Sequence, residues 1–231
     1  MIGPTDHQHF LKLNIAFGWF DSSHLHIEAF PNLKSFEVDN LILTDVDGVL
    51  LDWIGGFEKY MKSEYDLATV DASSYDIDKR FGITTTDGGF SYIQDFNHSP
   101  LIGELEVQRD AQFFVRKMVK LGYQFIVITS LSKRDSSCNL RIENLNRVFG
   151  DDAFEDFVFL DIGEHKVDAL ARFDGTGLPW IEDLPKNALD GHSVGLDTYL
   201  VNQTYNTTFA HEAIRRVENW SQIFNHIHKG I

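Results

Sequence analysis

Several polar residues able to do chemistry stand directly after short apolar runs of the length of buried strands. In chain order they are Asp45 and Asp47, Thr129 and Ser130, and Glu182 and Asp183, and Lys166 lies in the region that follows the run 157–160. Carboxylates without a His or Cys near them in sequence are the oxygen ligands that Mg²⁺ prefers, and hydroxyl and ammonium groups donate hydrogen bonds to phosphate oxygens. An aspartate at such a centre can attack phosphorus and form an aspartyl-phosphate. These residue types therefore predict metal-assisted chemistry on a phosphate ester.

Alternating strands and helices must position these residues. The runs with strand character are 41–44, 125–128, 157–160, 178–181 and 198–201, and helical apolar patterns lie at 111–121, 139–149 and 166–173. This alternation is typical of βαβ units, so the sequence predicts an α/β fold with a doubly wound parallel sheet. In such sheets ligands bind outside the carboxyl ends of the strands, and the polar residues above follow these ends.

Two parts of the chain stand outside this alternation. Residues 57–105 are rich in aromatic and turn residues and fall between the first and second predicted strands, so we expect a small, mainly helical cap there. The core would then comprise 41–56 and 106–231. Residues 1–40 contain two alternating stretches around a polar turn, which predict a β-hairpin extension. Its aromatic residues could cover a sheet edge or a second subunit, so a homodimer is one open possibility.

Composition limits the partners and the compartment. The 231 residues include 20 Lys and Arg against 35 Asp and Glu, a net charge of −15, which argues against polymeric nucleic acid and anionic membranes as partners. The single cysteine, Cys138, excludes an intramolecular disulfide and a Cys-rich zinc site. The sequence shows no long apolar window and no secretory-type start, so we expect a soluble cytoplasmic protein.

The ordered polar residues resemble the motifs of one phosphatase superfamily. The segment Asp45-Val46-Asp47-Gly48-Val49-Leu50 resembles the first motif of the haloacid dehalogenase superfamily. Ile128-Thr129-Ser130 is similar to its second motif, Lys166 to its third, and Ile181-Glu182-Asp183 to its acidic fourth, in the same order. An Asp-x-Asp-Gly alone is also found in turns and calcium loops, whereas the ordered set is specific. The resemblance implies a Mg²⁺-dependent hydrolase of phosphoric monoesters.

Within this superfamily the chain is similar to the 5'(3')-deoxyribonucleotidases. The first motif runs on through Asp52 and Trp53 into the expected cap, and Lys133 follows the second motif where that family has an additional phosphate-binding lysine. Glu182 departs from the family, which tends to carry Asp there. The implied substrate is a (deoxy)nucleoside monophosphate. A sugar phosphate or another small phosphorylated metabolite stays open, as does a non-catalytic binding protein of the same fold.

The resemblance also implies a role for each residue. Asp45 would be the nucleophile and a metal ligand, and Asp47 would donate a proton to the leaving oxygen and then accept one from water, with its backbone carbonyl facing the metal. Asp183 would bind the metal by its side chain. Glu182 would either lie next to the metal ligands without touching the metal or bind it through a water. The phosphoryl oxygens would be held by Thr129, Ser130, Lys133 and Lys166, and a nucleobase would stack on Trp53.

Several of these residues also have a structural alternative. Thr129 and Ser130 could cap a helix, and Glu182 and Asp183 could lie in a helical first turn, where negative charge is favourable. Trp53 could pack in the core, and a surface Lys133 could be replaced in its role by Arg134.

Overall fold

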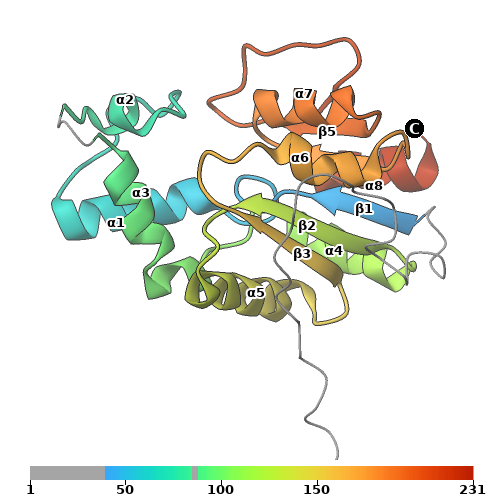
Figure 1. The fold of residues 1–231 in the computed structure, drawn as a ribbon, viewed down its shortest axis with the longest axis horizontal. Coiled ribbons are helices and arrows are strands. Elements are labelled where there is room, and N and C mark those ends of the chain that lie inside the picture. The colour runs from blue at the N-terminus through green and yellow to red at the C-terminus, as the bar shows by residue number, and fades with distance from the viewer. Residues whose placement is uncertain (1–39, 85–87, 231) are drawn as a thin grey trace, which may run out of the picture. The chain divides into compact units, whose positions relative to one another are not determined.

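A six-stranded sheet forms the centre of the chain (Figure 1), with its strands in the order β3-β2-β1-β4-β5-β6. The strands are β1 (Leu41–Thr44), β2 (Gln124–Ser130), β3 (Phe154–Leu160), β4 (Pro179–Glu182), β5 (Asp197–Val201) and β6 (Arg215–Val217). All neighbouring strands pair in parallel, which confirms the predicted doubly wound fold. The chain moves outward from β1 to β3 and then returns to β4 on the other side of β1. A ligand crevice is therefore expected between the carboxyl ends of β1 and β4.

The structure is a computed structural model that describes residues 40–84 and 88–230. These residues belong to one compact unit, Glu37–Ile231. The hairpin predicted within residues 1–40 lies outside the described residues. In the part of the chain that is described, no helix is both long and apolar enough to cross a membrane.

Helices cover both faces of the sheet (Figure 1). Successive strand residues point to opposite faces, so Ile42 and Val127 pack in a cluster with α4 (Ala111–Lys120), α5 (Asp135–Phe149) and α8 (Trp220–Lys229). The intervening Leu43 and Ile126 pack on the other face, beneath α6 (Lys166–Leu170) and η5 (Ala171–Phe173). The helix α7 (Pro185–Ser193) contacts β4 and β5. Burial on both faces explains why the central strands read as continuous apolar runs.

The segment between β1 and α4 is mainly helical and lies beyond the carboxyl ends of the strands (Figure 1). It contains α1 (Trp53–Tyr65), α2 (Ile77–Phe81), α3 (Phe90–Asn97) and the short η4 (Pro100–Gly103). Helix α1 begins where the Asp52 carboxylate accepts a hydrogen bond from Gly55 N, at 3.0 Å. Its buried Trp53, Phe57 and Met61 are four residues apart and share one face. The boundaries of the cap at 57–105 stay a prediction.

The last helix is fastened to the loop that follows β1. The indole Nε1 of Trp220, at the start of α8, donates to the Val49 carbonyl at 2.9 Å. The Asp110 carboxylate accepts from the backbone N–H groups of Trp220 and Ser221, at 2.9 and 3.0 Å. Helix α8 is therefore bonded both to the loop that carries Asp45 and Asp47 and to the residue at the start of α4.

Candidate active site

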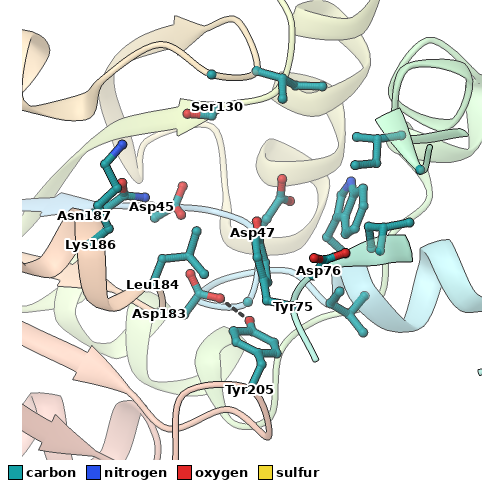
Figure 2. Close-up of a pocket in the computed structure, with 18 of the residues that line it drawn as sticks. Asp45, Asp47, Tyr75, Asp76, Ser130, Asp183, Leu184, Lys186, Asn187 and Tyr205 are labelled. Atoms are coloured by element: carbon teal, nitrogen blue, oxygen red, sulfur yellow. Dashed lines mark hydrogen bonds between the residues drawn. The ribbon is translucent and has the colours of Figure 1, made fainter. Parts of the chain in front are cut away.

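Three buried carboxylates meet at the carboxyl ends of β1 and β4. One oxygen from each of Asp45, Glu182 and Asp183 lies within 4.8 Å of the other two, and the three side chains come from two neighbouring strand ends. The backbone N–H of Asp45 donates to the Ile181 carbonyl at 2.9 Å, which locks the two ends together. Figure 2 shows Asp45 and Asp183 facing the same cavity. The structure thus brings together the acidic residues that the sequence placed at separate strand ends.

Lys166, the first residue of α6, lies between two of these carboxylates. Its Nζ is 2.7 Å from Asp45 Oδ2 and 2.9 Å from Glu182 Oε2, and the side chain is almost fully buried. The other oxygen of Glu182 accepts from Leu184 N at 3.0 Å and from Asn187 Nδ2 at 3.1 Å. Every charged atom of Lys166 and Glu182 therefore has a partner, and Glu182 is held by the loop after β4.

Burial and mutual repulsion raise the pKa of Glu182 and Asp183. Burial, then the charge of Asp45, raises the pKa of Glu182 to about 7, although Lys166 acts in the opposite direction. Burial and the neighbouring Glu182 raise the pKa of Asp183 well above its usual range. Burial alone would lower the pKa of Lys166, but Asp45 and Glu182 outweigh it and raise this pKa. One lysine therefore does not compensate three buried acids.

The donor set fits a hard divalent cation. Asp45 Oδ1 is buried and has no hydrogen-bond partner among the described residues, which is costly unless something positive binds there. The three carboxylates supply only oxygen ligands, as Mg²⁺ requires. Asp45 and Asp183 are the residues that would hold such an ion by their side chains, with Glu182 already engaged by Lys166.

Gly48 allows the loop after β1 to pass close to Asp183. Its φ of +76° lies in the left-handed region, and a Cβ at this position would collide with Asp183 Oδ2 and with the Tyr205 hydroxyl. The Gly48 carbonyl accepts hydrogen bonds from Gln203 Nε2 at 2.5 Å and Gln108 Nε2 at 3.5 Å. The turn that presents Asp45 and Asp47 is therefore specified by glycine and held by amide side chains.

Asp47 faces a different cation from Asp45. Its Oδ1 accepts from Nη1 of Arg141, on α5, at 2.5 Å. Arg141 is fully buried, whereas the Asp47 side chain is 23% exposed. Burial raises the pKa of Asp47, and the guanidinium of Arg141 opposes that shift. Asp47 is thus a partly accessible carboxyl beside the buried Asp45.

A cavity of about 470 Å³ opens over these residues (Figure 2). On the side of the sheet it is lined by Asp45, Asp47, Ser130, Lys166 and Asp183, and on the side of the inserted helices mainly by Trp53, Ile54, Tyr75, Phe90 and Ile93. One end is therefore charged and the other largely apolar. A ligand with a charged head and an apolar or aromatic body matches this division.

Trp53 lies at the wall of the cavity and also packs against neighbouring aromatic rings. It lines the cavity, stacks on Phe57 with ring centroids 4.7 Å apart, and donates from Nε1 to Asn97 Oδ1 at 2.9 Å. The side chain is 9% exposed. The ring is thus a fixed wall of the cavity.

Only some of the residues expected to bind phosphate line the cavity. Ser130 lines the cavity, whereas Thr129 is fully buried with its hydroxyl unpartnered among the described residues. Neither caps α5, because the residue before that helix is Arg134 and no side chain caps it. Lys133 forms a half-exposed ion pair of 2.6 Å with Glu164, which lines the cavity while Lys133 does not. A phosphate-binding role for Lys133 stays a prediction and requires that this ion pair open.

The structure also brings in residues that the sequence reasoning did not identify. Arg141 contacts Asp47, the Tyr205 hydroxyl donates to Asp183 Oδ2, and Lys186 lines the cavity with its Nζ 3.1 Å from His165 Nδ1. Tyr205 lies in the loop after β5, and its ring packs on Tyr75 at 5.1 Å. Only Arg141 had a sequence signal, because it stands at a position where the period of the helix calls for an apolar residue.

Comparison with known proteins identifies the fold. No family model and no curated protein sequence matches the chain. Among solved structures, a haloacid dehalogenase-like hydrolase from Streptococcus pneumoniae is 14% identical, with a TM-score of 0.58 over 84% of this chain and 100% of that one. The HAD-hydrolase YfnB from Bacillus subtilis, bound to magnesium, is 11% identical, with a TM-score of 0.56 over 82% and 98%. A D,D-heptose 1,7-bisphosphate phosphatase from B. bronchiseptica, complexed with magnesium and phosphate, is 12% identical, with a TM-score of 0.52 over 83% and 99%. The chain therefore has the haloacid dehalogenase-like fold.

Proposed function

We propose that this chain is a Mg²⁺-dependent phosphomonoesterase that forms an aspartyl-phosphate on Asp45. The observation that carries the proposal is the buried Asp45 carboxylate, which has one oxygen on Lys166 and the other unpartnered among the described residues, beside the partly exposed Asp47. A carboxylate able to act as nucleophile, a second able to carry a proton and a fixed cation thus line a cavity large enough for a small phosphate ester, which supports the proposal.

The residues divide the work of two displacements. Asp45 attacks phosphorus, the bond from phosphorus to the ester oxygen breaks, and Asp47 gives that oxygen a proton. Water then attacks the aspartyl-phosphate as Asp47 takes a proton back, and Asp45 is released together with phosphate. Lys166 contacts and orients Asp45, and Ser130 supplies a hydroxyl to the phosphoryl oxygens. A Mg²⁺ held by Asp45 and Asp183 would neutralise charge on the phosphate.

For the substrate we propose a (deoxy)nucleoside monophosphate. The support is the wall opposite the carboxylates, where Trp53, Tyr75 and Phe90 offer aromatic surface to a base. A sugar phosphate is the second candidate, since Asp76 and Asp78 also line the cavity and can accept hydrogen bonds from hydroxyl groups. Of the similar structures, the B. bronchiseptica enzyme acts on a sugar bisphosphate.

The nucleophile is tested by replacing Asp45 with Asn. Turnover of a generic aryl phosphate should fall by at least about 1,000-fold, because the amide cannot form the covalent intermediate. Acid-quenched wild-type protein should carry label from a ³²P-phosphate ester that hydroxylamine releases, and Asp45→Asn should carry none. Asp174→Asn, which changes an exposed carboxylate, is the matched control. Retained turnover in Asp45→Asn would contradict the mechanism.

The substrate is tested with a panel of 5' and 3' nucleoside monophosphates and sugar phosphates, each with Mg²⁺ and with a chelator. The nucleotides should have the higher kcat/KM, and the chelator should abolish the activity. A preference for sugar phosphates would favour the second candidate. No hydrolysis of any ester would favour a binding protein that keeps the fold without catalysis.

A further inference from the structure

One face of α5 buries polar side chains where a helix packed on a core normally buries apolar ones. Ser137, Arg141 and Asn144 are each 0% exposed, and their spacing places them on one face of the helix. We refer to these three residues as the α5 polar face. Burying a polar group costs free energy unless it has a hydrogen-bond partner. The partners of these three side chains therefore indicate the role of the α5 polar face.

The two outer members of the α5 polar face hold the last residue of α3 and the segment that follows it. Ser137 Oγ donates to the Asn97 carbonyl at 2.8 Å. Asn144 accepts from Leu105 N at 3.1 Å and donates to the Leu105 carbonyl at 3.3 Å. Asn97 in turn accepts from the indole of Trp53, the fixed wall of the cavity. The face is therefore tied at both ends to the inserted helical segment.

The central member, Arg141, contacts the loop after β1, which carries Asp45 and Asp47. Its Nη1 donates to Asp47 Oδ1, while Nε and Nη2 have no hydrogen-bond partner among the described residues. A fully buried guanidinium is strongly unfavourable without a counter-charge, and Asp47 is its one carboxylate partner within the described chain. The pair therefore fixes the Asp47 side chain, because moving this carboxylate away would leave a buried charge unpaired.

We propose that Arg141 is the positioning residue for Asp47 in the reaction described above, so this inference rests on the proposed function. The guanidinium holds Oδ1, which leaves Oδ2 to exchange the proton. In the first displacement that proton passes from Oδ2 to the leaving oxygen as the ester bond breaks. In the second, Oδ2 takes a proton from the attacking water. Arg141 stays protonated throughout and touches neither the substrate nor the phosphorus.

The first test uses two leaving groups that differ in their need for a proton. In Arg141→Met, kcat/KM for an alkyl phosphate should fall by about 100-fold, because an alkoxide needs general acid help to depart. For 4-nitrophenyl phosphate the loss should be less than about 5-fold, since the phenolate departs without a proton. Arg141→Lys, which keeps a charge but not the planar donors, should restore part of the alkyl activity. Equal losses on both esters, or no loss, would overturn the positioning role.

The matched control is Arg147→Met. Arg147 lies on the same helix and donates to the Gly103 carbonyl of the same inserted segment at 2.6 Å, but it is half exposed and does not contact Asp47. Its removal should leave the ratio of alkyl to aryl activity unchanged. An inactive wild type on both esters would overturn the proposed function itself, whereas an active wild type with equal losses in Arg141→Met overturns only the role of Arg141.

A second test requires no activity. Thermal unfolding is measured in a chelator for the wild type, Arg141→Met, Asp47→Ala and the double variant. Arg141→Met should lower the Tm in the wild-type background and raise it in the Asp47→Ala background, where the buried guanidinium has lost its partner. The same sign of change in both backgrounds would overturn the pairing. If Arg141→Met does not fold, Arg141→Gln, which removes the charge and keeps amide donors, replaces it in both tests, with a smaller leaving-group effect expected.

Discussion

The two aspartates of the loop after β1 stand beside cations of very different surroundings. Lys166 lies between Asp45 and Glu182, and each of its partners is also buried. Arg141 has one carboxylate partner, which is partly exposed, and two of its donor atoms have no partner among the described residues. The proposed nucleophile is therefore held in a buried cluster of one lysine and three carboxylates, and the proposed proton carrier in a single ion pair. A nucleophile must stay in place through both displacements, whereas a proton carrier must serve two partners in turn.

The largest expected loss of stability and of turnover comes from replacing Lys166. Lys166→Met leaves Asp45 and Glu182 buried without a counter-charge, so the free energy of unfolding should fall by about 3–5 kcal/mol in a chelator. Turnover should fall by at least about 100-fold, because the fixed cation at the phosphoryl group is lost. Urea unfolding followed by circular dichroism measures the first quantity.

The contrast between the two ion pairs is tested by ranking how much stability each variant loses. Arg141→Met should cost less stability than Lys166→Met, since the carboxylate it leaves behind reaches water. Lys186→Met, which removes an exposed lysine at the cavity, should change the free energy of unfolding by less than about 0.5 kcal/mol. An Arg141 variant that loses as much stability as the Lys166 variant would contradict the distinction.

A change of pH is expected to have an intermediate effect on the stability of the metal-free protein. The pKa of Glu182 is about 7 in the folded chain, against an ordinary value of 4.5. Between these pH values the folded state keeps a proton that the unfolded state releases, so the stability of the metal-free protein should fall as pH rises from about 4.5 to 7. The loss from Glu182 should be on the order of 3 kcal/mol.

Tm measured in a chelator at each half pH unit checks this sign. Glu182→Gln should flatten the decline, because the amide does not ionise. Mg²⁺ should stabilise the wild type more at pH 8 than at pH 5. A Tm that rises across this range would show that Glu182 is ionised in the folded state, as a carboxylate fully compensated by Lys166 would be.

A smaller effect, on metal affinity, is expected from replacing Tyr205. Its hydroxyl donates to Asp183, so Tyr205→Phe should weaken Mg²⁺ binding by about 10-fold in calorimetry, by loosening the ligand. Tyr199→Phe is the matched control, since it removes a hydroxyl that donates to Asp197 at 2.9 Å, away from the cavity. Unchanged affinity in Tyr205→Phe would mean that Asp183 is oriented by its backbone alone.

The residues at the strand ends were predictable because the carboxyl ends of parallel strands always lie at the same edge of a sheet. Asp45, Ser130, Lys166 and Asp183 were identified by the apolar runs before them, and the structure places all four at one cavity. Strand β6 was missed, since its three residues include two arginines at the sheet edge. Such a short edge strand has no apolar run to reveal it.

The residues that surround the strand ends were not predictable in the same way. Whether Arg141 points to Asp47 depends on the rotation of α5 about its axis, which the sequence does not fix. Tyr205 reaches Asp183 through the conformation of a loop. The cavity wall depends on how α1 and α3 pack, and the sequence singled out Trp53 only through a family resemblance.

The hydrogen bond from Trp220 to the Val49 carbonyl joins groups 171 positions apart in the chain. The loop with both aspartates is among the first elements of the described fold, yet the helix that fastens it is the last. Chain closure over such a separation is entropically costly and comes late in folding. During synthesis the aspartates therefore emerge long before their support, and we expect the nascent chain to acquire its reactive geometry only after α8 has left the ribosome.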